Sequence, residues 1–536
     1  MSELFKNQCK RIPEWKFLEW VPQLLAALYS PKVAAVSDLL LRLAEKYPNA
    51  LIYPFRLSKE MQAKVSSSTQ TIVDSLGTLL DCDYGTEKFL KAMACLCLPD
   101  VKLRSFLGRL KTSLEANDGK CAVCIGAVLE IFDEAEIKGN IYSLIGDLKK
   151  DIIELKKYVD KGKLKEALRQ TENIMRAITP CYHKQPSRDA RISLKSYSPW
   201  LASFISTAYS STIEMPGQYS GKMRPDLKNH IMIAGFKTEV SVMQSLRRPI
   251  KLTMIGNDGN EYSFLVKCGE DLRQDQRIQQ LLTLMNSSLT SNSGTAARKL
   301  SIVTYAVVPL SSSLGLIQWV NDTVPLKELM FKFFLESDIE KYRDSTVINY
   351  SMSNFRKSFM SNSLNLEAFI SMRNEFLCSY AVMSICHWIL GIGDRHLSNT
   401  LVNVFTGKCL GIDFGHAFGS ATQILPVPEL MPFRLTPHIL DLAEPFKEFG
   451  LLRESMVSAL KCQKDNQHVL LATMQVFIQE PSMDWFENAH KLAQKQSGES
   501  DGSKNFHDNF IRWLYFTYPP LAKKALLHIL TKGSLV

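Results

Sequence analysis

The sequence feature that most limits the possible folds is a change in the spacing of the apolar residues. From Glu14 to about Ile178 they recur three and four positions apart, as in FLEWVPQLLAALYS and AVSDLLLRLAEKY. This spacing is typical of amphipathic helices, so we expect stacked helical hairpins there. After residue 199 short strand-like runs follow, with turn sequences such as GNDGN between them: HIMIAGF, IKLTMIG, EYSFLVK and LSIVTYAVVP. Helical spacing returns from about Leu364 to Trp485.

The length indicates more than one domain. Single domains rarely grow beyond about 250 residues, and this chain has 536. We expect a helical part (1–195), a small β-rich lobe with its connection (196–320), a larger helical lobe (321–495), and a linker with a tail (496–536). The longest nearly uncharged apolar stretch, Ser379–Gly393, is shorter than the about 20 residues that span a bilayer. It predicts a buried core helix and no membrane partner.

A group of polar residues follows this apolar stretch, in LGIGDRHLSNTLV. Phosphoryl transfer needs a carboxylate near the attacking hydroxyl, ligands for Mg²⁺, and positive charge on the phosphates. Asp394 precedes Asn399 by five positions, which is the spacing of the catalytic Asp and the metal-binding Asn in protein kinases. His396 lies after the Asp, however, and in those kinases the His comes before it. On its own this spacing is weak evidence.

Two further stretches supply the other requirements. In CLGIDFGHAFG a short strand-like run leads to Asp413, which is well placed to hold a metal that bridges phosphate oxygens. Lys267 ends the strand-like run EYSFLVK, and a Lys fixed by a carboxylate can present its ammonium group to phosphates. Asp275 is the first candidate for that carboxylate and Glu270 the second. The alternative for Asp413 is an ordinary Asp in a turn, and the alternative for Lys267 is a surface Lys at the end of a strand.

Two segments are candidates for nucleotide contacts. Ser245, Leu246 and Arg247 lie in MQSLRRPIKL, which joins two strand-like runs. This segment can cover phosphates with N–H groups and a hydroxyl, but it lacks the usual glycines, so an ordinary hairpin turn is the alternative. LGLIQWVN, with Gln318, Trp319 and Val320, connects the two lobes, where an adenine would stack and hydrogen-bond to the backbone.

Taken together, the stretches GDRHLSN, GIDFGHAFGSA, VPELMPFRLT and VKCGEDLRQDQR resemble the phosphatidylinositol 3-kinase-related protein kinases. The resemblance runs from about Arg11 to Trp485. It implies an α+β fold, in which a FAT-type helical array precedes a two-lobed kinase-like catalytic domain. It also implies that ATP and Mg²⁺ are cofactors.

The same resemblance implies a role for each candidate residue. Lys267 and Asp275 would serve the phosphates, and Trp319 would line the adenine pocket, with Tyr305 deep beneath it. In the larger lobe, Asp394 would orient or deprotonate the substrate hydroxyl. His396 would steady the transferring phosphoryl group, and Asn399 and Asp413 would bind Mg²⁺.

The resemblance favours a Ser/Thr protein kinase that phosphorylates residues followed by Gln. It further implies a nuclear role in DNA double-strand-break repair, with DNA ends and the Ku heterodimer as partners of the full-length enzyme. A phosphoinositide kinase would share these motifs, but residues 416–431 contain no Lys or Arg to bind a phosphorylated headgroup. A non-catalytic scaffold is the other alternative. The family's FATC tail is not recognisable after residue 504, and the chain is far shorter than a complete enzyme of this family, so we expect a fragment, a splice form or a truncated gene product.

Overall fold

The computed structural model describes residues 2–30, 32–60, 67–81, 84–97, 99–116, 119, 121–133, 145–182, 191–205, 213–243, 245, 247–333, 353–418 and 433–477. The chain divides into two compact units. The first comprises Met1–Leu272 and Ala306–Trp319, and the second comprises Arg273–Tyr305 and Val320–Val536. The units are described in turn.

The first unit opens with helices that share one core. In α3 (Val33–Lys46) the buried residues Val36, Leu39, Leu40 and Leu43 recur at helical spacing, so one face of the helix packs inward. The elements that share this core are α1 (Ser2–Cys9), η1 (Glu14–Trp20), α2 (Val21–Ala27), α3, α4 (Pro48–Glu60) and α5 (Ser67–Leu79), and α6 (Tyr84–Ala94) follows them. The predicted helical region is therefore confirmed in this part of the chain.

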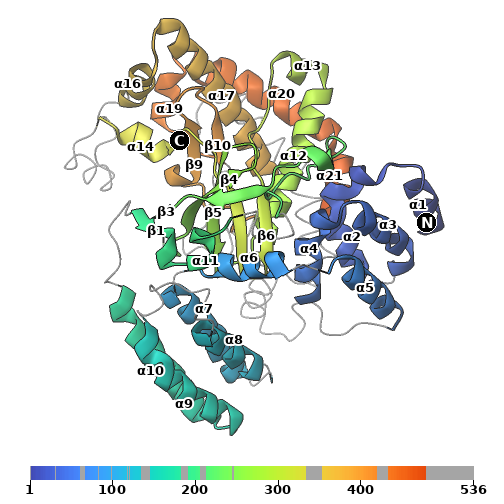
Figure 1. The fold of residues 1–536 in the computed structure, drawn as a ribbon. Helices are drawn as coiled ribbons and strands as arrows, with labels where there is room; N and C mark the ends of the chain where they lie inside the picture. Colours follow the sequence, from blue (N-terminus) through green and yellow to red (C-terminus); the bar gives the residue numbers. More distant parts are fainter. Residues whose placement is uncertain are drawn as a thin grey trace, which may run out of the picture. The chain divides into compact units, whose positions relative to one another are not determined.

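Helices α7 (Pro99–Ala116), α8 (Cys121–Asp133), α9 (Lys149–Asp160) and α10 (Leu164–Tyr182) lie side by side and form a bundle with its own core (Figure 1). Ile145, Leu148, Ile152 and Leu155 recur at three- and four-residue spacing within the predicted helical region, and they are buried in this core. Ile141 and Leu144 continue the same spacing in the sequence and lie outside the described residues. We refer to these four helices as the α7–α10 bundle.

The described strands of the first unit form one antiparallel sheet, in the order β1-β3-β4-β5-β7-β6, with β2 paired to the second half of β4. The strands are β1 (Arg191–Ser193), β2 (Ile233–Phe236), β3 (Glu239–Val242), β4 (Ile250–Gly256), β5 (Glu261–Cys268), β6 (Val307–Ser311) and β7 (Leu314–Gln318). Buried and half-buried residues alternate along β4, as a sheet with one face on the core requires. The buried face packs on α6, on η3 (Leu194–Ser196) and on α11 (Pro199–Ala202).

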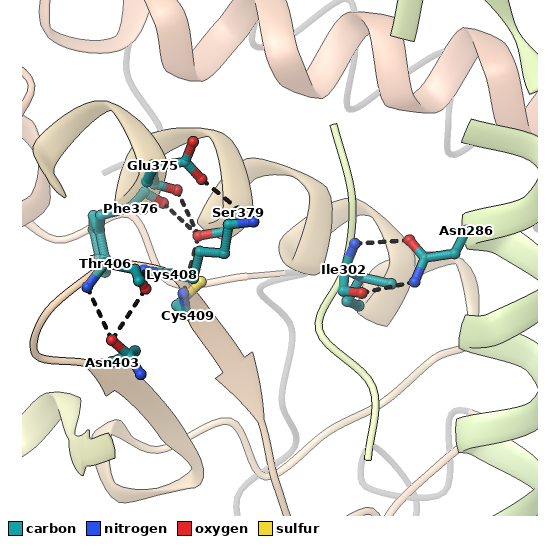
Figure 2. A network of polar contacts seen from close by, with 9 residues as sticks. All are labelled: Asn286, Ile302, Glu375, Phe376, Ser379, Asn403, Thr406, Lys408 and Cys409. Atoms are coloured by element: carbon teal, nitrogen blue, oxygen red, sulfur yellow. Dashed lines mark hydrogen bonds and ion pairs between the residues drawn. The ribbon is translucent and has the colours of Figure 1, made fainter. Parts of the chain in front are cut away.

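Two strand predictions need correction. LSIVTYAVVP was expected to be one strand from Leu300, but β6 begins only at Val307. The preceding residues are bound to α12 (Arg273–Ser291) instead: Asn286 exchanges two hydrogen bonds with the backbone of Ile302 (2.7 and 2.8 Å), as Figure 2 shows. LGLIQWVN was expected to be a connection, but its first five residues form β7, which pairs with both β5 and β6.

The second unit is mainly helical around a small sheet. Its strands β8 (Thr323–Pro325), β9 (Thr400–Asn403) and β10 (Cys409–Gly411) pair in the order β10-β9-β8. Its helices include α12, α13 (Ser293–Ala297), α14 (Leu326–Phe331), α16 (Ser353–Asn362), α17 (Leu366–Ile389), α19 (Pro437–Leu442), α20 (Leu451–Asp465) and α21 (Gln467–Phe477). The second half of α17 is almost wholly buried, which confirms the predicted core helix. Among the described helices, none has both the length and the apolar composition needed to cross a membrane.

Candidate active site

The predicted catalytic loop begins where α17 ends, and it returns to the segment that carries Asp413. The amide of Gly393 donates to the main-chain oxygen of His416 at 2.9 Å, which brings the two segments together. Asp394 and Asp413 both have left-handed backbone conformations, with φ of 54° and 60°. Residues other than glycine rarely adopt this conformation, and it is concentrated at functional sites.

Asn399 links the predicted base to the predicted metal site. Its side-chain Nδ2 donates to the main-chain oxygen of Asp394 at 2.9 Å, and its own main-chain oxygen accepts from the amide of Ile412 at 3.0 Å. Asn399 ends the short helix η6 (Leu397–Asn399) and is buried, whereas Asp413 is exposed. The three residues Asp394, Asn399 and Asp413 are therefore held in one hydrogen-bonded structure.

Arg395 holds the same two segments together, a role that its place in the motif did not reveal. Its guanidinium group donates to the main-chain oxygens of Gly393 (2.9 Å), Ile412 (2.8 Å) and Asp413. It also lies 5.5 Å from the ring centroid of Phe414. A guanidinium group has five N–H donors in a fixed plane, so one side chain can fix several carbonyl groups at once.

Helix α12 fixes the residue after Asp413. The Oδ1 atom of Asp275 accepts from the amide of Phe414 at 3.3 Å, and Gln274 Nε2 donates to the oxygen of the same residue at 2.6 Å. The hydroxyl of Tyr305 donates to the oxygen of Gly411 at 3.3 Å, and burial raises the pKa of this hydroxyl well above its usual value. Within the second unit, Asp275 thus positions the segment that carries Asp413, the predicted metal ligand. Lys267 lies in the first unit, and its pairing with Asp275 stays a prediction.

The other side of this segment packs against His387 of α17. A Cβ atom on Gly411 would lie 2.3 Å from His387 Cε1, so only glycine fits there. The imidazole also makes an edge contact with Phe414, with 5.6 Å between the ring centroids. Burial lowers the pKa of His387 well below its usual value, and Arg395 lowers it further. Its Nε2 atom has no hydrogen-bond partner among the described residues.

Strand β10, which leads to Asp413, is anchored to α17 at its first residue. Figure 2 shows the amide of Cys409 donating to Ser379 Oγ at 3.0 Å, while that hydroxyl donates to the main-chain oxygen of Glu375 at 2.7 Å. Lys408 Nζ lies 3.7 Å from the carboxylate of the same Glu375. These contacts fix where β10 begins and therefore where Asp413 stands.

The donor set suits a magnesium ion held mainly by phosphate. The described residues contain no cluster of three or more His, Cys, Asp or Glu side chains that could hold a metal alone. Mg²⁺ in nucleotide sites is usually bound through one or two protein oxygens, with waters and phosphate oxygens completing its shell. Asn399 and Asp413 supply two such oxygens on adjoining segments.

His396 caps η6 with its ring. Its Nδ1 atom accepts from the amide of Ser398 at 3.2 Å, and the residue is exposed. A neutral imidazole that accepts at Nδ1 carries its proton at Nε2, so the remaining nitrogen is a donor. A donor on the exposed side of the loop is compatible with the predicted contact to a phosphoryl group.

In the first unit, Lys267 lies on the less buried face of the sheet. Leu265 lies two positions before Lys267 on β5, so both side chains are on the same face of the sheet. Leu265 pairs with Lys251 of β4 and with Ile317 of β7, which therefore share this face. Lys267 Nζ lies 3.3 Å from Glu270 Oε1. Glu270 was the second candidate for a carboxylate partner, and this ion pair supports it.

Trp319 follows β7 and is fixed by the sheet. Its amide donates to the main-chain oxygen of Ser263 at 2.9 Å, and the Lys251 ammonium lies 4.3 Å from the centroid of its ring. Lys251 was not predicted, although the alternation along IKLTMIG could have placed it on this face. The backbone of Gln318 is used by the sheet, because its amide donates to Ala306 at 2.8 Å. The adenine contacts of Gln318, Trp319 and Val320 stay predictions.

The predicted phosphate loop is a turn between β3 and β4. Ser245 Oγ accepts from the amide of Arg248 at 3.2 Å, and the Arg247 guanidinium group donates to the oxygen of Gly269. Leu246 lies outside the described residues, and so does most of the segment 416–431, whose lack of Lys and Arg argued against a lipid headgroup.

Most of the predicted site residues lie in a region that matches a known protein family. Residues 261–487 match the family described as phosphatidylinositol 3- and 4-kinase. The chain contains a kinase domain of this family. The match includes Lys267, Asp394, Asn399 and Asp413, so the predicted resemblance and the α+β kinase-like fold are confirmed.

Relatives of the kinase domain extend the similarity to the helices before it. The chain is 34% identical to the DNA-dependent protein kinase catalytic subunit of Xenopus laevis, over 93% of this chain and 13% of that protein. It is 28% identical to the serine/threonine-protein kinase tor1 of Schizosaccharomyces pombe, over 88% of this chain and 21% of that protein. The solved FAT and kinase domain of CtTel1 is similar in fold, with a TM-score of 0.64 and 20% identity over 99% of this chain and 34% of that one. The chain thus spans about one eighth of the first relative.

Proposed function

We propose that this chain is the catalytic part of a Ser/Thr protein kinase that transfers the γ-phosphate of ATP to protein hydroxyl groups. The observation that supports this most strongly is the hydrogen bond from Asn399 Nδ2 to the oxygen of Asp394, with Ile412 bound to the same Asn399. It joins the base, one metal ligand and the segment of the second ligand. A domain that kept the sequence motif but did not transfer phosphoryl groups would not need this hydrogen bond between Asn399 and Asp394.

Each residue then has a defined task. Asp394 accepts or orients the proton of the substrate hydroxyl, and His396 donates from Nε2 to the transferring group. Asn399 and Asp413 would hold Mg²⁺, which supplies charge neutralisation at the phosphate oxygens. Lys267, fixed by Glu270 at 3.3 Å, presents its ammonium group to the phosphates. Arg395, Asp275 and Tyr305 hold the segment that leads to and follows Asp413 by hydrogen bonds to its backbone.

The substrate that we propose is protein Ser or Thr followed by Gln, in DNA double-strand-break repair. Support comes from the similarity to a kinase named as DNA-dependent, and from the absence of Lys and Arg in residues 416–431. Phosphorylated lipid headgroups need cationic partners, whereas an apolar segment with prolines favours an extended peptide. On this proposal the full-length enzyme acts in the nucleus, with the Ku heterodimer and DNA ends as partners.

The test of this substrate class compares three acceptors at equal concentrations of Mg-ATP: a Ser-Gln peptide, its Ser-Glu variant, and phosphatidylinositol vesicles. A pocket that hydrogen-bonds the neutral amide should favour Gln by about 10- to 100-fold in kcat/KM, since an unpaired buried polar group costs about 1–3 kcal/mol. Equal rates for the two peptides would contradict the Gln preference. Preferential phosphorylation of the vesicles would show a lipid kinase instead.

A further inference from the structure

A buried ion pair joins the α7–α10 bundle to the turn between β3 and β4. Arg248 Nη2 lies 2.9 Å from Asp100 Oδ2. The side chain of Asp100 is 2% exposed and that of Arg248 is 12% exposed. Asp100 stands in the first turn of α7, and Arg248 is the second residue before β4. Because either charge would be costly to bury alone, the pair fixes the position of the turn relative to α7.

The backbone of this turn has to be held in place. Arg248 has φ of 43°, in the left-handed region that residues other than glycine rarely adopt. Its amide donates to both the main-chain oxygen and the hydroxyl of Ser245, each at 3.2 Å. These local bonds and the contact with Asp100 together over-determine a conformation that the sequence alone does not favour.

Helix α7 also lies against the turn that follows Lys267. A Cβ atom on Gly269, which has φ of 77°, would lie 3.6 Å from Ser105 Oγ of α7. Arg247 donates to the oxygen of Gly269 and lies 3.8 Å from Glu270, and Glu270 lies 3.3 Å from Lys267. One helix therefore supports both the predicted phosphate loop and the turn that holds the phosphate-binding Lys.

We propose that Asp100 is a positioning residue for nucleotide binding, acting through Arg248 on the loop that covers the phosphates. Asp100 itself does not touch the nucleotide. This inference rests on the proposed function, because the loop has a ligand only if the domain binds ATP. It gives the α7–α10 bundle a task within the kinase: the bundle sets the affinity for ATP, and displacement of α7 lowers that affinity.

The first arm of the test measures the Kd of a non-hydrolysable Mg-ATP analogue for the wild-type chain and for Asp100→Asn. We expect binding at least fivefold weaker in the variant, with kcat at saturating ATP changed less than twofold. The matched control is Lys111→Met, because Lys111 pairs with Glu172 at 2.9 Å and joins α7 to α10 within the same bundle. This control should bind the analogue within twofold of the wild type. Equal losses in the two variants would overturn the proposal, since they would indicate general loosening of the bundle.

The second arm measures amide hydrogen exchange in the protein without nucleotide, so it does not depend on kinase activity. Asp100→Asn should exchange faster at the amides of Met243, Ser245 and Arg248 and at residues 268–270, while Lys111→Met leaves these amides unchanged. Unchanged exchange in a folded Asp100→Asn protein would refute the proposed positioning role. If Asp100→Asn does not fold, Arg248→Lys, which keeps the charge but not the reach, is measured in its place with the same expected results. A wild-type chain that binds no Mg-ATP would contradict the proposed function, and the exchange arm would still decide whether Asp100 holds the loop.

Discussion

The side chain of Asn399 donates to the main-chain oxygen of Asp394 at 2.9 Å, so a predicted metal ligand also fixes the backbone of the predicted base. An amide side chain can do both, because its nitrogen donates while its oxygen coordinates. Asn399→Asp keeps a metal-binding oxygen but loses the donor and sets a carboxylate against a carbonyl oxygen. We expect kcat to fall by about 100-fold or more, comparable to the loss of one essential hydrogen-bond donor at an active site.

Asn403 provides the matched control for this substitution. Its Oδ1 atom accepts from the amides of Phe405 (3.1 Å) and Thr406 (2.9 Å), so an Asp would preserve both bonds. Figure 2 shows the bond to Thr406. Asn403→Asp should therefore retain kcat within about twofold, because the one bond that it loses, from Nδ2 to the main-chain oxygen of Asn321, is exposed and long at 3.4 Å. Steady-state kinetics give kcat for both variants. A similar fall in kcat in Asn399→Asp and Asn403→Asp would disprove the proposed role of the Asn399 side chain in fixing Asp394.

A second prediction concerns Gly411, whose missing side chain leaves room for His387. Gly411→Ala would place a Cβ atom 2.3 Å from Cε1 and 2.8 Å from Nε2 of that buried ring. Overpacking of this kind typically costs about 1–3 kcal/mol of unfolding free energy. We expect the phosphoryl-transfer rate to fall as well, because β10 leads directly to Asp413. Urea unfolding followed by tryptophan fluorescence measures the loss.

Gly77 of α5 is the corresponding control, because nothing lies within 4 Å of a Cβ atom built on it. Gly77→Ala should stabilise the helix by about 0.5–1 kcal/mol, since alanine has the higher helix propensity. An unfolding free energy for Gly411→Ala equal to or above that of the wild type would show that His387 does not occupy the space as described.

Stability should depend on pH through His387. Its folded pKa is lowered by burial, so below the usual pKa near 6.5 the unfolded chain binds a proton that the folded chain does not. The unfolding free energy is therefore unaffected above that pH and falls below it, by up to about 1.4 kcal/mol per pH unit for each such group. Burial also lowers the pKa of His438, which adds to the same trend.

The contribution of His387 to this pH dependence can be isolated with His387→Gln, because a Gln side chain does not titrate between pH 5.5 and pH 7.5. We expect the difference in unfolding free energy between pH 7.5 and pH 5.5 to be smaller in this variant than in the wild type. The contribution of His438 should remain. An unchanged difference would mean that His387 is protonated in the folded protein.

A fourth prediction concerns Lys267 and its fixation by Glu270. Lys267→Met removes the positive charge that we propose contacts the phosphates. We expect kcat/KM for ATP to fall by about 100-fold or more, which corresponds to a loss of several kcal/mol of transition-state stabilisation. Lys237→Met is the control, because Lys237 pairs with Glu261 at 2.7 Å and both side chains are about half exposed. That pair should contribute little, so activity within twofold of the wild type is expected. Equal kcat/KM values for the two variants would rule out the assigned role of Lys267.

The sequence permitted some of these features to be predicted and concealed others for physical reasons. Helical spacing and the alternation in β4 and β5 report local burial, so most elements could be placed from them. The beginning of β6 could not, because Leu300 to Tyr305 is bound to α12 by contacts distant in sequence, such as that of Asn286 with Ile302. The same holds for Arg395 and His387: each lies beside a recognised motif, but its partners come from segments up to 27 residues away along the chain.

The central claim is that Asp394, Asn399 and Asp413 form the catalytic centre of a protein kinase. The most direct measurement is a single-turnover assay of γ-phosphate transfer from Mg-ATP to a Ser-Gln peptide, with the wild-type chain, Asp394→Asn and Asp413→Asn. We expect Mg²⁺-dependent transfer by the wild-type chain and none detectable with either variant, although both variants should have the unfolding free energy of the wild type. A neutral amide cannot accept the proton or neutralise the developing charge. Transfer at near wild-type rates by a folded Asp413→Asn protein would contradict the account.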